Sequence, residues 1–391
     1  MSSYIVAACR TPIGKLLGSL ASVPAMQLGS IVVREALLRS GFSPSEVDEV
    51  ILGNVLSAGL GQAPARQAAL GAGLPPSVAA LTINKVCGSG LKAVMLADNA
   101  IRCGDAEVVI AGGMESMSRA PYLLQGIRAG WKLGDQPAVD SMVYDGLFCP
   151  FEKGHMGAAA DYIAQSRGVS REAQDAYAVE SHRRAVASVA AGHFDAEIVA
   201  VPVVGRRGAE QRVTQDEGPR ADTSLEALNN LRPSFHPNGS VTAGNASQLS
   251  DGAAAVVVVD QRRAARFDSS VKARIVASAT SGVAPKEIFI APVSAIERVL
   301  QRAGLTIGDI DLFELNEAFA AQSLACMGPL GLPPEKLNIR GGAIALGHPI
   351  GASGARVLVT LLHALADRGL KRGLASLCLG GGNAVAMIVE R

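Results

Sequence analysis

The sequence lacks an excess of charge, a long apolar run and a leader-like start, and each absence excludes a class of protein. Its 36 Lys and Arg residues nearly balance 35 Asp and Glu residues, so the net charge of +1 gives no general basis for binding nucleic acid or an anionic membrane. No uncharged run approaches the roughly 20 residues of a membrane span. The opening stretch MSSYIVAACRTPIGK has no basic segment before its short apolar run, so we expect no signal peptide and predict a cytoplasmic protein.

Aromatic residues and paired cysteines are also scarce. Aromatics make up 4% of the chain and hydrophobic residues 49%, so a large core has to be built from Ala, Val, Leu and Ile, as in layered α/β proteins. The length of 391 residues allows two or three domains at roughly 150 residues each. No cysteines form a CxxC pair or a zinc-like cluster with His, and we expect free thiols rather than disulfides at Cys9, Cys87, Cys103, Cys149, Cys326 and Cys378.

Two distant stretches of the chain resemble each other. LLRSGFSPSEVDEVILGN (Leu37 to Asn54) aligns with LQRAGLTIGDIDLFELNE (Leu300 to Glu317) at a constant offset of 263. Each has the pattern of a helix end, a glycine cap, a turn and a strand. Shorter parallels follow, between SGLKAV and SGARVL and between VVIAGG and SLCLGG. The sequence therefore predicts two copies of one α/β module.

A different kind of sequence separates the two copies. From about Arg119 to Ser250 the chain carries its only Trp, proline-containing turns and polar stretches, and this length is too great for a plain connection. We expect an inserted loop domain with its own helices, for example over Arg171 to Ala191, before DGAAAVVVVD (Asp251 to Asp260) returns to the core as a strand. The predicted domains are a first core half over 1–118 and 251–268, the loop domain over 119–250 and a second core half over 269–391.

Cys87 lies in NKVCGSGLKAV, between a strand-like run and an amphipathic one. Leu91, Val94 and Met95 recur after it at helical spacing, so Cys87 sits at or just before a helix N-terminus, where the dipole and free N–H groups favour a thiolate. The neighbouring glycines would let a substrate acyl group approach closely. The local sequence leaves two interpretations of Cys87 equally open, a nucleophile and an ordinary buried thiol.

GSGLKA also matches the fingerprint of a dinucleotide-binding site. The acidic residue that would bind the ribose should end the next strand, but here it begins that strand, which disfavours this interpretation.

Three further polar side chains stand at strand ends or helix starts. His348 lies in the glycine-rich NIRGGAIALGHPIGASGARV ahead of a helix expected from near Ser353, and such a loop favours a functional role. Cys378 ends the strand-like LASLCL before three glycines and the returning AVAMIV, a hairpin pattern in which a buried thiol is the simpler interpretation. Asn316 follows IDLFEL, where a helix N-cap and a functional amide are both open.

Together the two thiols, the imidazole and the amide suit carbon–carbon bond chemistry on a thioester. One thiolate can hold an acyl group, the imidazole can activate that thiol, and the second thiol can exchange a proton beside another thioester's carbonyl. Hydrogen-bond donors must stabilise the oxyanions. Because one of these residues lies in the first copy and three in the second, we expect them to meet at the interface between the copies.

Five motifs make the chain resemble the thiolase family, most closely its acetyl-CoA acetyltransferases: NKVCGSGLKAV, NIRGGAIALGHPIGASG, GLASLCLGGG, LFELNEAFA and VTAGNASQLSDGAAA. The resemblance spans essentially the whole chain and implies the duplicated α/β thiolase fold, five-layered αβαβα, with the loop domain over the active site. It implies reversible Claisen condensation of two acetyl-CoA to acetoacetyl-CoA and CoA, or thiolysis in reverse, through an acyl-cysteine. Acetyl-CoA, acyl-CoA and CoA are the expected partners, with no metal, no separate cofactor, no nucleic acid and no membrane.

The same resemblance assigns roles to the polar residues. Cys87 is expected to be the acyl-accepting nucleophile, activated by His348, whose ring N–H also helps to bind the substrate oxygen. Cys378 is expected to be the acid/base acting on the acetyl methyl group or the CoA thiol. Asn316 is expected to hold a water that completes one oxyanion hole, and the backbone N–H groups of Cys87 and Gly380 are expected to form the other.

Coenzyme A is expected to lie along the loop domain. By its place in the motifs, Ser247 contacts the pantetheine and Arg220 lies beside the adenine and phosphate end, within a basic cluster that includes Arg206, Arg207 and Arg212. The stretch RAPYLLQGIRAGWKLGDQPAVDSM resembles the family's tetramerisation loop, which implies a homotetramer built as a dimer of dimers. The other residues expected to contact substrate or CoA are Leu147, His155, Met156, Phe235, Ala243 and Phe319.

One departure from the family pattern concerns the length of the acyl chain that the site accepts. Acetyl-specific relatives often carry Met-Gly-x-Gly-Pro where this chain has IFIAP, so Ile288 replaces a pocket methionine. A longer-chain 3-ketoacyl-CoA thiolase of fatty-acid degradation therefore stays open, as does a non-catalytic thiolase-like protein that binds acyl-CoA or lipid. A β-ketoacyl synthase shares the duplicated architecture but normally uses a Cys-His-His set, whereas Asn316 and Cys378 occupy the partner positions here.

Overall fold

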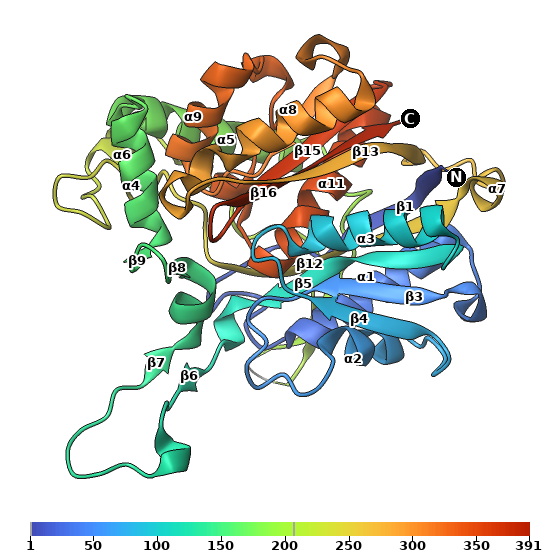
Figure 1. Cartoon of the computed structure of the whole chain (residues 1–391), viewed down its shortest axis with the longest axis horizontal. Helices are drawn as coiled ribbons and strands as arrows, with labels where there is room; N and C mark the ends of the chain where they lie inside the picture. Colours follow the sequence, from blue (N-terminus) through green and yellow to red (C-terminus); the bar gives the residue numbers. More distant parts are fainter. Residues whose placement is uncertain (1, 206–207) are drawn as a thin grey trace.

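The computed structural model describes residues 2–205 and 208–391, and its centre is a ten-stranded mixed sheet. The strand order is β14-β15-β16-β13-β1-β12-β5-β3-β4, with the short β2 (Gly14–Lys15) paired to β12. Within the described residues, β1 pairs with β13 at just two positions, Tyr4 and Ile5, so the sheet divides there into two halves. Figure 1 shows the halves one above the other, with helices between and outside them.

The first half is covered by two helices outside and one inside. Helices α1 (Ala25–Ser40) and α2 (Pro64–Gly71) pack on its outer side, and α3 (Ser89–Cys103) packs on its inner face. The predicted strand DGAAAVVVVD is confirmed as β12, and it is buried throughout because both faces of the sheet are covered. The strands of this half are β1 (Ser3–Arg10), β3 (Glu49–Gly53), β4 (Ala79–Ile83), β5 (Val108–Ser116) and β12 (Ser250–Asp260).

The second half repeats this arrangement. Helix α8 (Ala291–Ala303) covers its outer face and α11 (Ile350–Asp367) its inner face, where α11 also packs against α3. The layers α1/α2, sheet, α3/α11, sheet and α8 confirm the predicted five-layered architecture. The strands are β13 (Ala273–Gly282), β14 (Leu312–Leu315), β15 (Arg372–Leu379) and β16 (Asn383–Glu390), and the shorter helices are α7 (Gln261–Ala264), α9 (Ala320–Leu330) and α10 (Ala343–Leu346).

The predicted internal repeat is confirmed down to single hydrogen bonds. Helices α1 and α8 both end at a left-handed glycine, Gly41 and Gly304, each with φ 65°. A 3-10 turn with a capping box and then a strand follow in both copies. The carboxylate of Asp48 accepts from the N–H groups that open β5, and its counterpart Asp311 accepts from those that open β15. The two modules therefore use the same local interactions to join their strands.

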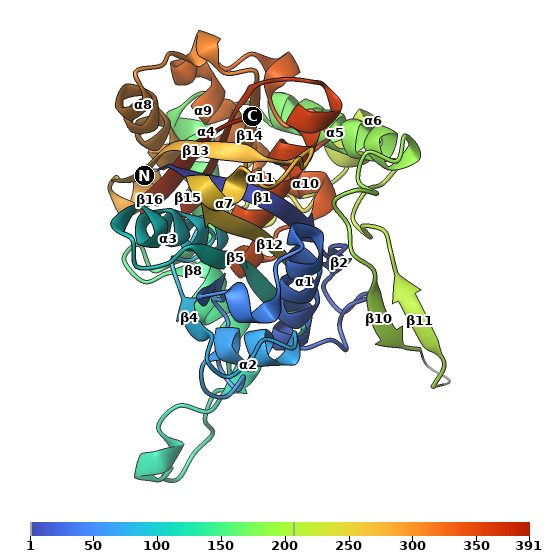
Figure 2. The same ribbon diagram turned by 90° about the vertical axis from the view of Figure 1, so that its right-hand side faces the viewer.

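The residues between β5 and β12 form helices, short hairpins and an arm. Helix α5 (Arg171–Ala190) confirms the predicted helix to within one residue, and α4 (Met156–Ser166) and α6 (Leu225–Asn229) lie near the second half. The arm leaves the body through β6 (Tyr122–Leu123) and β7 (Val139–Asp140), as Figures 1 and 2 show. The remaining elements are η4 (Met142–Leu147), β8 (Phe148–Cys149), β9 (Gly154–His155), β10 (Val201–Val204) and β11 (Glu210–Val213).

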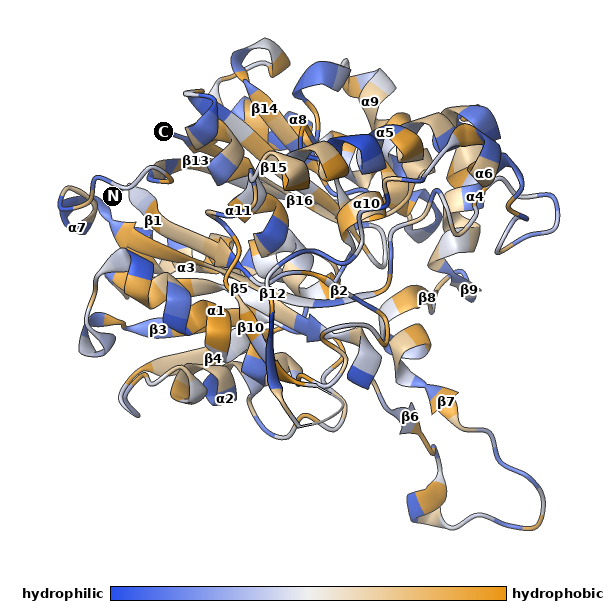
Figure 3. Cartoon of the chain, turned by 180° about the vertical axis from the view of Figure 1, so that it is seen from behind, coloured by the Kyte–Doolittle hydropathy of each residue, from blue (hydrophilic) through white to orange (hydrophobic). Residues whose placement is uncertain are grey.

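Helix α11 occupies the centre of the molecule. Among the described residues it alone is long and apolar enough to cross a membrane, but 89% of it is buried inside the fold, which identifies it as a core helix. In Figure 3 the hydrophobic colours gather on the strands of both halves, while the outer helices carry both hydrophobic and hydrophilic residues. The protein therefore buries its most apolar segments between its two modules.

Glycines let α11 approach the first half closely. A Cβ atom on Gly90 of α3 would lie 2.6 Å from the backbone nitrogen of Ala355, and one on Gly113 of β5 would overlap the carbonyl oxygen of Gly351. Neither obstacle is a flexible side-chain end. The beginning of α11 is thus held against the first half by backbone-to-backbone packing.

Replacing Gly90 with alanine is expected to lower the free energy of unfolding by about 2 kcal/mol, since the added methyl group must push α3 and α11 apart. The matched control is Gly328→Ala in α9, where no atom from another part of the fold lies within 4 Å of the added Cβ. Alanine favours helix more than glycine, but Pro329 follows and disfavours a helical residue with a Cβ, so the free energy of unfolding should change by less than about 1 kcal/mol. Urea unfolding of both variants measures the difference, and equal midpoints would contradict the packing argument.

Candidate active site

A cavity of about 420 Å³ opens where the two halves and the inserted residues meet. It lies beyond the carboxyl ends of β4, β14 and β15, the edge at which open α/β sheets bind ligands. Its mostly apolar lining is typical of a small-molecule site. The predicted site residues that line it are Cys87, Leu147, His155, Met156, Phe235, Ala243, Ser247, Phe319, His348, Cys378 and Gly380.

Cys87 lies in the turn between β4 and α3, directly before the N-cap residue Gly88, as predicted. The preceding Val86 has φ 47°, a left-handed conformation that is strained for a β-branched residue. Ser89 holds this turn, because its Oγ accepts from the N–H of Lys85 at 2.8 Å and donates to the carbonyl oxygen of Val86 at 2.7 Å. The strained turn places Cys87 in the cavity wall.

The Cys87 thiol is not a resting thiolate, so that expectation from the helix N-terminus is wrong. Burial raises the pKa of the Cys87 thiol to about 12, and the backbone groups of Gly380 and of Cys87 itself offset only part of this effect. Desolvation in an apolar cavity outweighs the dipole of a helix that begins two residues later. A base must therefore take the thiol proton when a thioester arrives.

The glycines beside Cys87 serve packing, and the interpretation that they give a substrate clearance is wrong. A Cβ atom on Gly88 would lie 2.5 Å from Cδ2 of Leu379 and close to Val385, both in the second half. Gly90 faces the backbone of α11 in the same way. These glycines bring the turn of Cys87 against the module that carries the other polar groups.

His348 lies in the loop between α10 and α11, and its ring touches two polar side chains. Its Nδ1 is 2.6 Å from Oγ of Ser353, and its Nε2 is 3.5 Å from Nδ2 of Asn316. The single hydroxyl proton of Ser353 is donated to the carbonyl oxygen of Pro349 at 2.9 Å. With that bond made, Nδ1 carries the ring proton and Nε2 is the nitrogen that can accept a proton.

The resting imidazole of His348 is neutral. Burial, and then the positive charge of Arg356, lower the pKa of His348 to about 3. A neutral ring is the form that can act as a base toward a thiol.

Helix α11 begins at Ile350 and not near Ser353 as predicted, because Pro349, with φ −67°, already has a backbone suited to a helix start. Ser353 consequently sits in the first turn, below the imidazole.

Cys378 stands at the tip of the predicted hairpin, which is confirmed. It lies at the end of β15 and pairs with Ala384 of β16. Its side chain is 2% exposed, and burial, followed by the proximity of Cys87, raises the pKa of Cys378 well above its usual value. Gly380 in the following turn lines the same cavity as Cys87. Two protonated thiols and a neutral imidazole thus share one cavity.

Asn316 is not a helix cap, so the N-cap interpretation is wrong. Helix α9 begins at Ala320 with Phe319 as its N-cap, and the residues between Asn316 and Phe319 are not helical. The N–H of Asn316 donates to the carbonyl oxygen of Ser376, and Phe319 forms an isolated β-bridge with Ala246. This irregular path leaves the buried amide free to approach His348. Its Oδ1 accepts no hydrogen bond from the described residues.

Arg220 lies outside the lining of the cavity. It is exposed, and its backbone N–H donates to Nδ1 of His182 at 3.1 Å. Its assignment to the adenine and phosphate end stays a prediction. Arg206 and Arg207 of the expected basic cluster fall outside the described residues, whereas Arg212 lies exposed in β11.

Two residues that support the site were not predicted from the sequence. Ser353 contacts the imidazole, and its place five residues after His348 in HPIGAS was the available signal. Glu115 ends β5 and accepts from the N–H groups of Val55, Leu56 and Gly351, so it ties the first turn of α11 to the first half. Burial raises the pKa of Glu115 to about 7. Further lining residues that were not predicted are Val86, Met142, Gln248, Phe289, Ala318 and Ile350.

Comparisons with known proteins agree with this geometry along the whole chain. The thiolase N-terminal domain matches residues 3–262, and the thiolase C-terminal domain matches residues 269–391. An acetyl-CoA acetyltransferase of Pseudomonas aeruginosa is 53% identical over 387 residues, which are 99% of this chain and 98% of that protein. An acetyl-CoA acetyltransferase of Cupriavidus necator matches with the same identity and the same coverage.

A solved structure leads to the same result. The crystal structure of the Bacillus anthracis acetyl-CoA acetyltransferase superimposes with a TM-score of 0.97 at 42% identity, covering 100% of this chain and 98% of that one. The duplicated five-layered fold and the sequence matches over both halves point to one conclusion. The chain belongs to the thiolase family.

Proposed function

We propose that the protein is an acetyl-CoA C-acetyltransferase, which condenses two acetyl-CoA molecules to acetoacetyl-CoA and CoA and also runs the reverse thiolysis. The observation that carries the proposal is the convergence of Cys87, Cys378 and His348 on one apolar cavity. The full-length similarity to acetyl-CoA acetyltransferases supports the choice of acetyl groups. CoA thioesters are the substrates, and the chemistry requires no further cofactor.

In the first step Cys87 takes an acetyl group. Nε2 of His348 accepts the thiol proton while the sulfur attacks the thioester carbonyl carbon. The bond between that carbon and the CoA sulfur breaks, and CoA leaves after its sulfur has received a proton from Cys378. Cys378 becomes a thiolate, while Nε2 of His348 keeps the proton taken from Cys87. Where Cys378 is absent, the proton on His348 can protonate CoA instead. The N–H groups of Cys87 and Gly380 stabilise the oxyanion of the tetrahedral intermediate.

In the second step a carbon–carbon bond forms. Cys378, as its thiolate, removes a proton from the methyl group of a second acetyl-CoA, and His348 with an Asn316-bound water stabilises the enolate oxygen. The enolate carbon attacks the acetyl carbon on Cys87. The bond from that carbon to the Cys87 sulfur then breaks, and the sulfur regains its proton from Nε2 of His348 as acetoacetyl-CoA forms.

Coenzyme A enters along the inserted residues in this proposal. Ser247 contacts the pantetheine, and Arg220 lies beside the phosphates of the adenine end, where a guanidinium group is suited to bind. Phe235 supports the pantetheine tunnel, since its ring stacks on His155 with centroids 4.7 Å apart and meets Phe319 edge-on at 6.3 Å.

A longer-chain 3-ketoacyl-CoA thiolase is the alternative, and Ile288 is the residue that bears on it. Ile288 is 2% exposed and lines the cavity beside Phe289. A thiolysis assay over increasing 3-ketoacyl chain lengths should give the highest kcat/KM for acetoacetyl-CoA. Each added pair of carbons should lower kcat/KM, and Ile288→Ala should weaken this decline because it removes part of the wall. A rise in kcat/KM with chain length in the unchanged protein would favour the longer-chain thiolase.

A homotetramer is part of the proposal, and the arm supports it. The segment between β6 and β7 extends from the body (Figure 1) and exposes large apolar side chains, with Leu133 fully exposed and Ile127 54% exposed. A protruding apolar segment of this kind is typical of a protein–protein contact. Light scattering of the purified protein should give the mass of four chains.

A further inference from the structure

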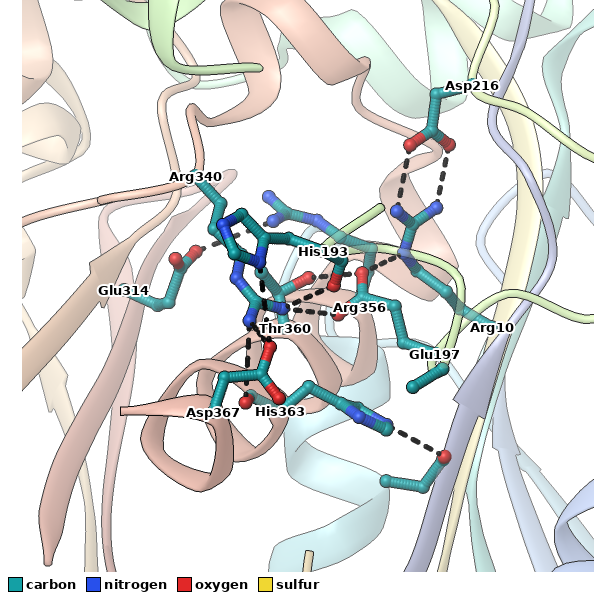
Figure 4. A network of polar contacts seen from close by, with 12 residues as sticks. Arg10, His193, Glu197, Asp216, Glu314, Arg340, Arg356, Thr360, His363 and Asp367 are labelled. Atoms are coloured by element: carbon teal, nitrogen blue, oxygen red, sulfur yellow. Dashed lines mark hydrogen bonds and ion pairs between the residues drawn. The ribbon is translucent and has the colours of Figure 1, made fainter. Parts of the chain in front are cut away.

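A stripe of polar side chains runs along one face of α11, inside the protein. Ser353, Arg356, Thr360 and His363 recur at helical spacing and are all buried. The stripe begins at the imidazole of His348, which Ser353 contacts. Figure 4 shows Arg356, Thr360 and His363 within a larger network of arginines and carboxylates.

Arg356 is a buried cation with one ion-pair partner among the described residues. Its side chain is 2% exposed, and its Nη1 lies 3.5 Å from Oε2 of Glu314, which is itself 3% exposed. Within the described part of the chain, Nε and Nη2 of Arg356 have no hydrogen-bond partner. A buried guanidinium with so little compensation exerts a strong field on its surroundings, because little water screens it.

The other carboxylates near the pair are bound by other groups. Arg10 bonds to Glu197 at 2.5 Å and to both oxygens of Asp216, and Arg340 bonds to Asp367. Glu317 accepts hydrogen bonds from Ser181 and Asn338. Glu314 is therefore the carboxylate whose ionisation changes the compensation of Arg356 most directly. The charged and titratable groups that surround the pair from all sides are Arg10, Glu197, Asp216, Glu317, Arg340, His363 and Asp367.

Glu314 titrates in an accessible range of pH. Burial raises the pKa of Glu314 to about 8, an effect that Arg356 opposes and that Glu317 and Glu197 reinforce. Below this pH the carboxyl group is neutral and Arg356 stands uncompensated. Above it the carboxylate balances the guanidinium charge one helical turn from Ser353.

We propose that Glu314 and Arg356 are positioning residues that set the basicity of His348, and through it the reactivity of Cys87. The inference rests on the proposed role of His348 as the base for Cys87. An uncompensated Arg356 disfavours the imidazolium form that His348 takes when it accepts the thiol proton. An ionised Glu314 cancels this repulsion, so the thiolate–imidazolium pair forms more readily.

The test is the pH dependence of Cys87 alkylation by iodoacetamide, in the unchanged protein and in Glu314→Gln, with the labelled peptide identified by mass spectrometry. The alkylation rate of the unchanged protein divided by that of Glu314→Gln should be near 1 below about pH 7 and rise to about 10 above about pH 9. The variant is slower at high pH because glutamine cannot supply the compensating charge. A ratio that stays constant over the whole pH range would overturn the proposal, because a structural role would scale all rates alike.

Arg356→Met tests the opposite sign. Removing the cation should raise the alkylation rate at pH 7 by about tenfold, and a merely structural role would lower it. The double variant Glu314→Gln/Arg356→Met buries no unpaired charge. If the single variant Arg356→Met does not fold, the alkylation rate of Cys87 at pH 7 is measured in the double variant instead, with the same expected rise. A slower rate in the folded variant contradicts the proposal.

Asp216→Asn serves as the matched control. It alters the same network at Arg10, away from the Glu314 pair, and should leave the shape of the pH profile unchanged. Labelling of Cys87 in the unchanged protein distinguishes failure of the proposed function from failure of the role assigned to Glu314. If Cys87 is not labelled at all, the proposed function fails, whereas labelling with a flat ratio overturns the role of Glu314 alone.

Discussion

Replacement of Cys378 by alanine should abolish condensation and thiolysis while Cys87 still becomes acetylated. The expected loss in kcat is at least about a thousandfold, in the range for removal of a general acid or base. Cys378 is the second thiol in the cavity, and its pKa is raised well above the usual value, mainly by burial. A thiolate formed there is a strong base, which suits the removal of a weakly acidic methyl proton.

The matched control for this variant is Cys9→Ala. Cys9 is also a buried thiol with a raised pKa, but its Sγ donates to the carbonyl oxygen of Val32 in the first half and it is not part of the cavity wall. Its replacement should change kcat less than threefold. Condensation by Cys378→Ala at close to the unchanged rate would remove Cys378 from the mechanism and leave its burial as the sole explanation of its position.

Replacement of Cys87 by alanine should produce the other large effect, a loss of at least about 10⁴-fold in kcat, because no remaining group can hold the acyl chain. Cys87 lies in a turn whose strain at Val86 is maintained by Ser89, so the alanine variant should keep the fold. Cys103→Ser, at the exposed end of α3, is the control and should be fully active. Activity in Cys87→Ala within tenfold of the unchanged protein would be incompatible with covalent catalysis at this residue.

The repeat could be predicted from the sequence because its signals are local. A glycine that ends a helix, a capping box and a strand within eighteen residues are encoded by neighbouring positions, and Gly41 and Gly304 adopt the conformation that this pattern requires. The hairpin that carries Cys378 was predictable for the same reason. Each of these features depends on residues close together in the chain.

The errors concern interactions between residues far apart in the chain. Gly88 and Gly90 are glycines because Leu379 and Ala355 pack against them, and no local pattern reveals such partners. The prediction of a thiolate at Cys87 was wrong because burial in the cavity raises the pKa of its thiol. The second module and the insert create that cavity. Asn316 resembled an N-cap, but its N–H pairs with Ser376 of the neighbouring strand, and the helix begins only at Ala320.

The supporting residues were the least visible in the sequence. Glu314 belongs to a strand in which a charged residue has no obvious use, and its pairing with Arg356 depends on the position of α11 between the two modules. Ser353 likewise acquires its role only when Pro349 starts the helix early enough to bring it under His348. The nucleophile and its base could thus be proposed from motifs, whereas the groups that set their pKa values required the structure.

The most direct test of the account is the mass of the Cys87 peptide after brief incubation of the protein with acetyl-CoA. The account predicts one acetyl group per subunit on that peptide, removed again when CoA is added. The adduct should persist in Cys378→Ala and be absent from Cys87→Ala. An active preparation that carries no acetyl group on Cys87, or carries it on another residue, would contradict the central claim that this thiol accepts the acyl group.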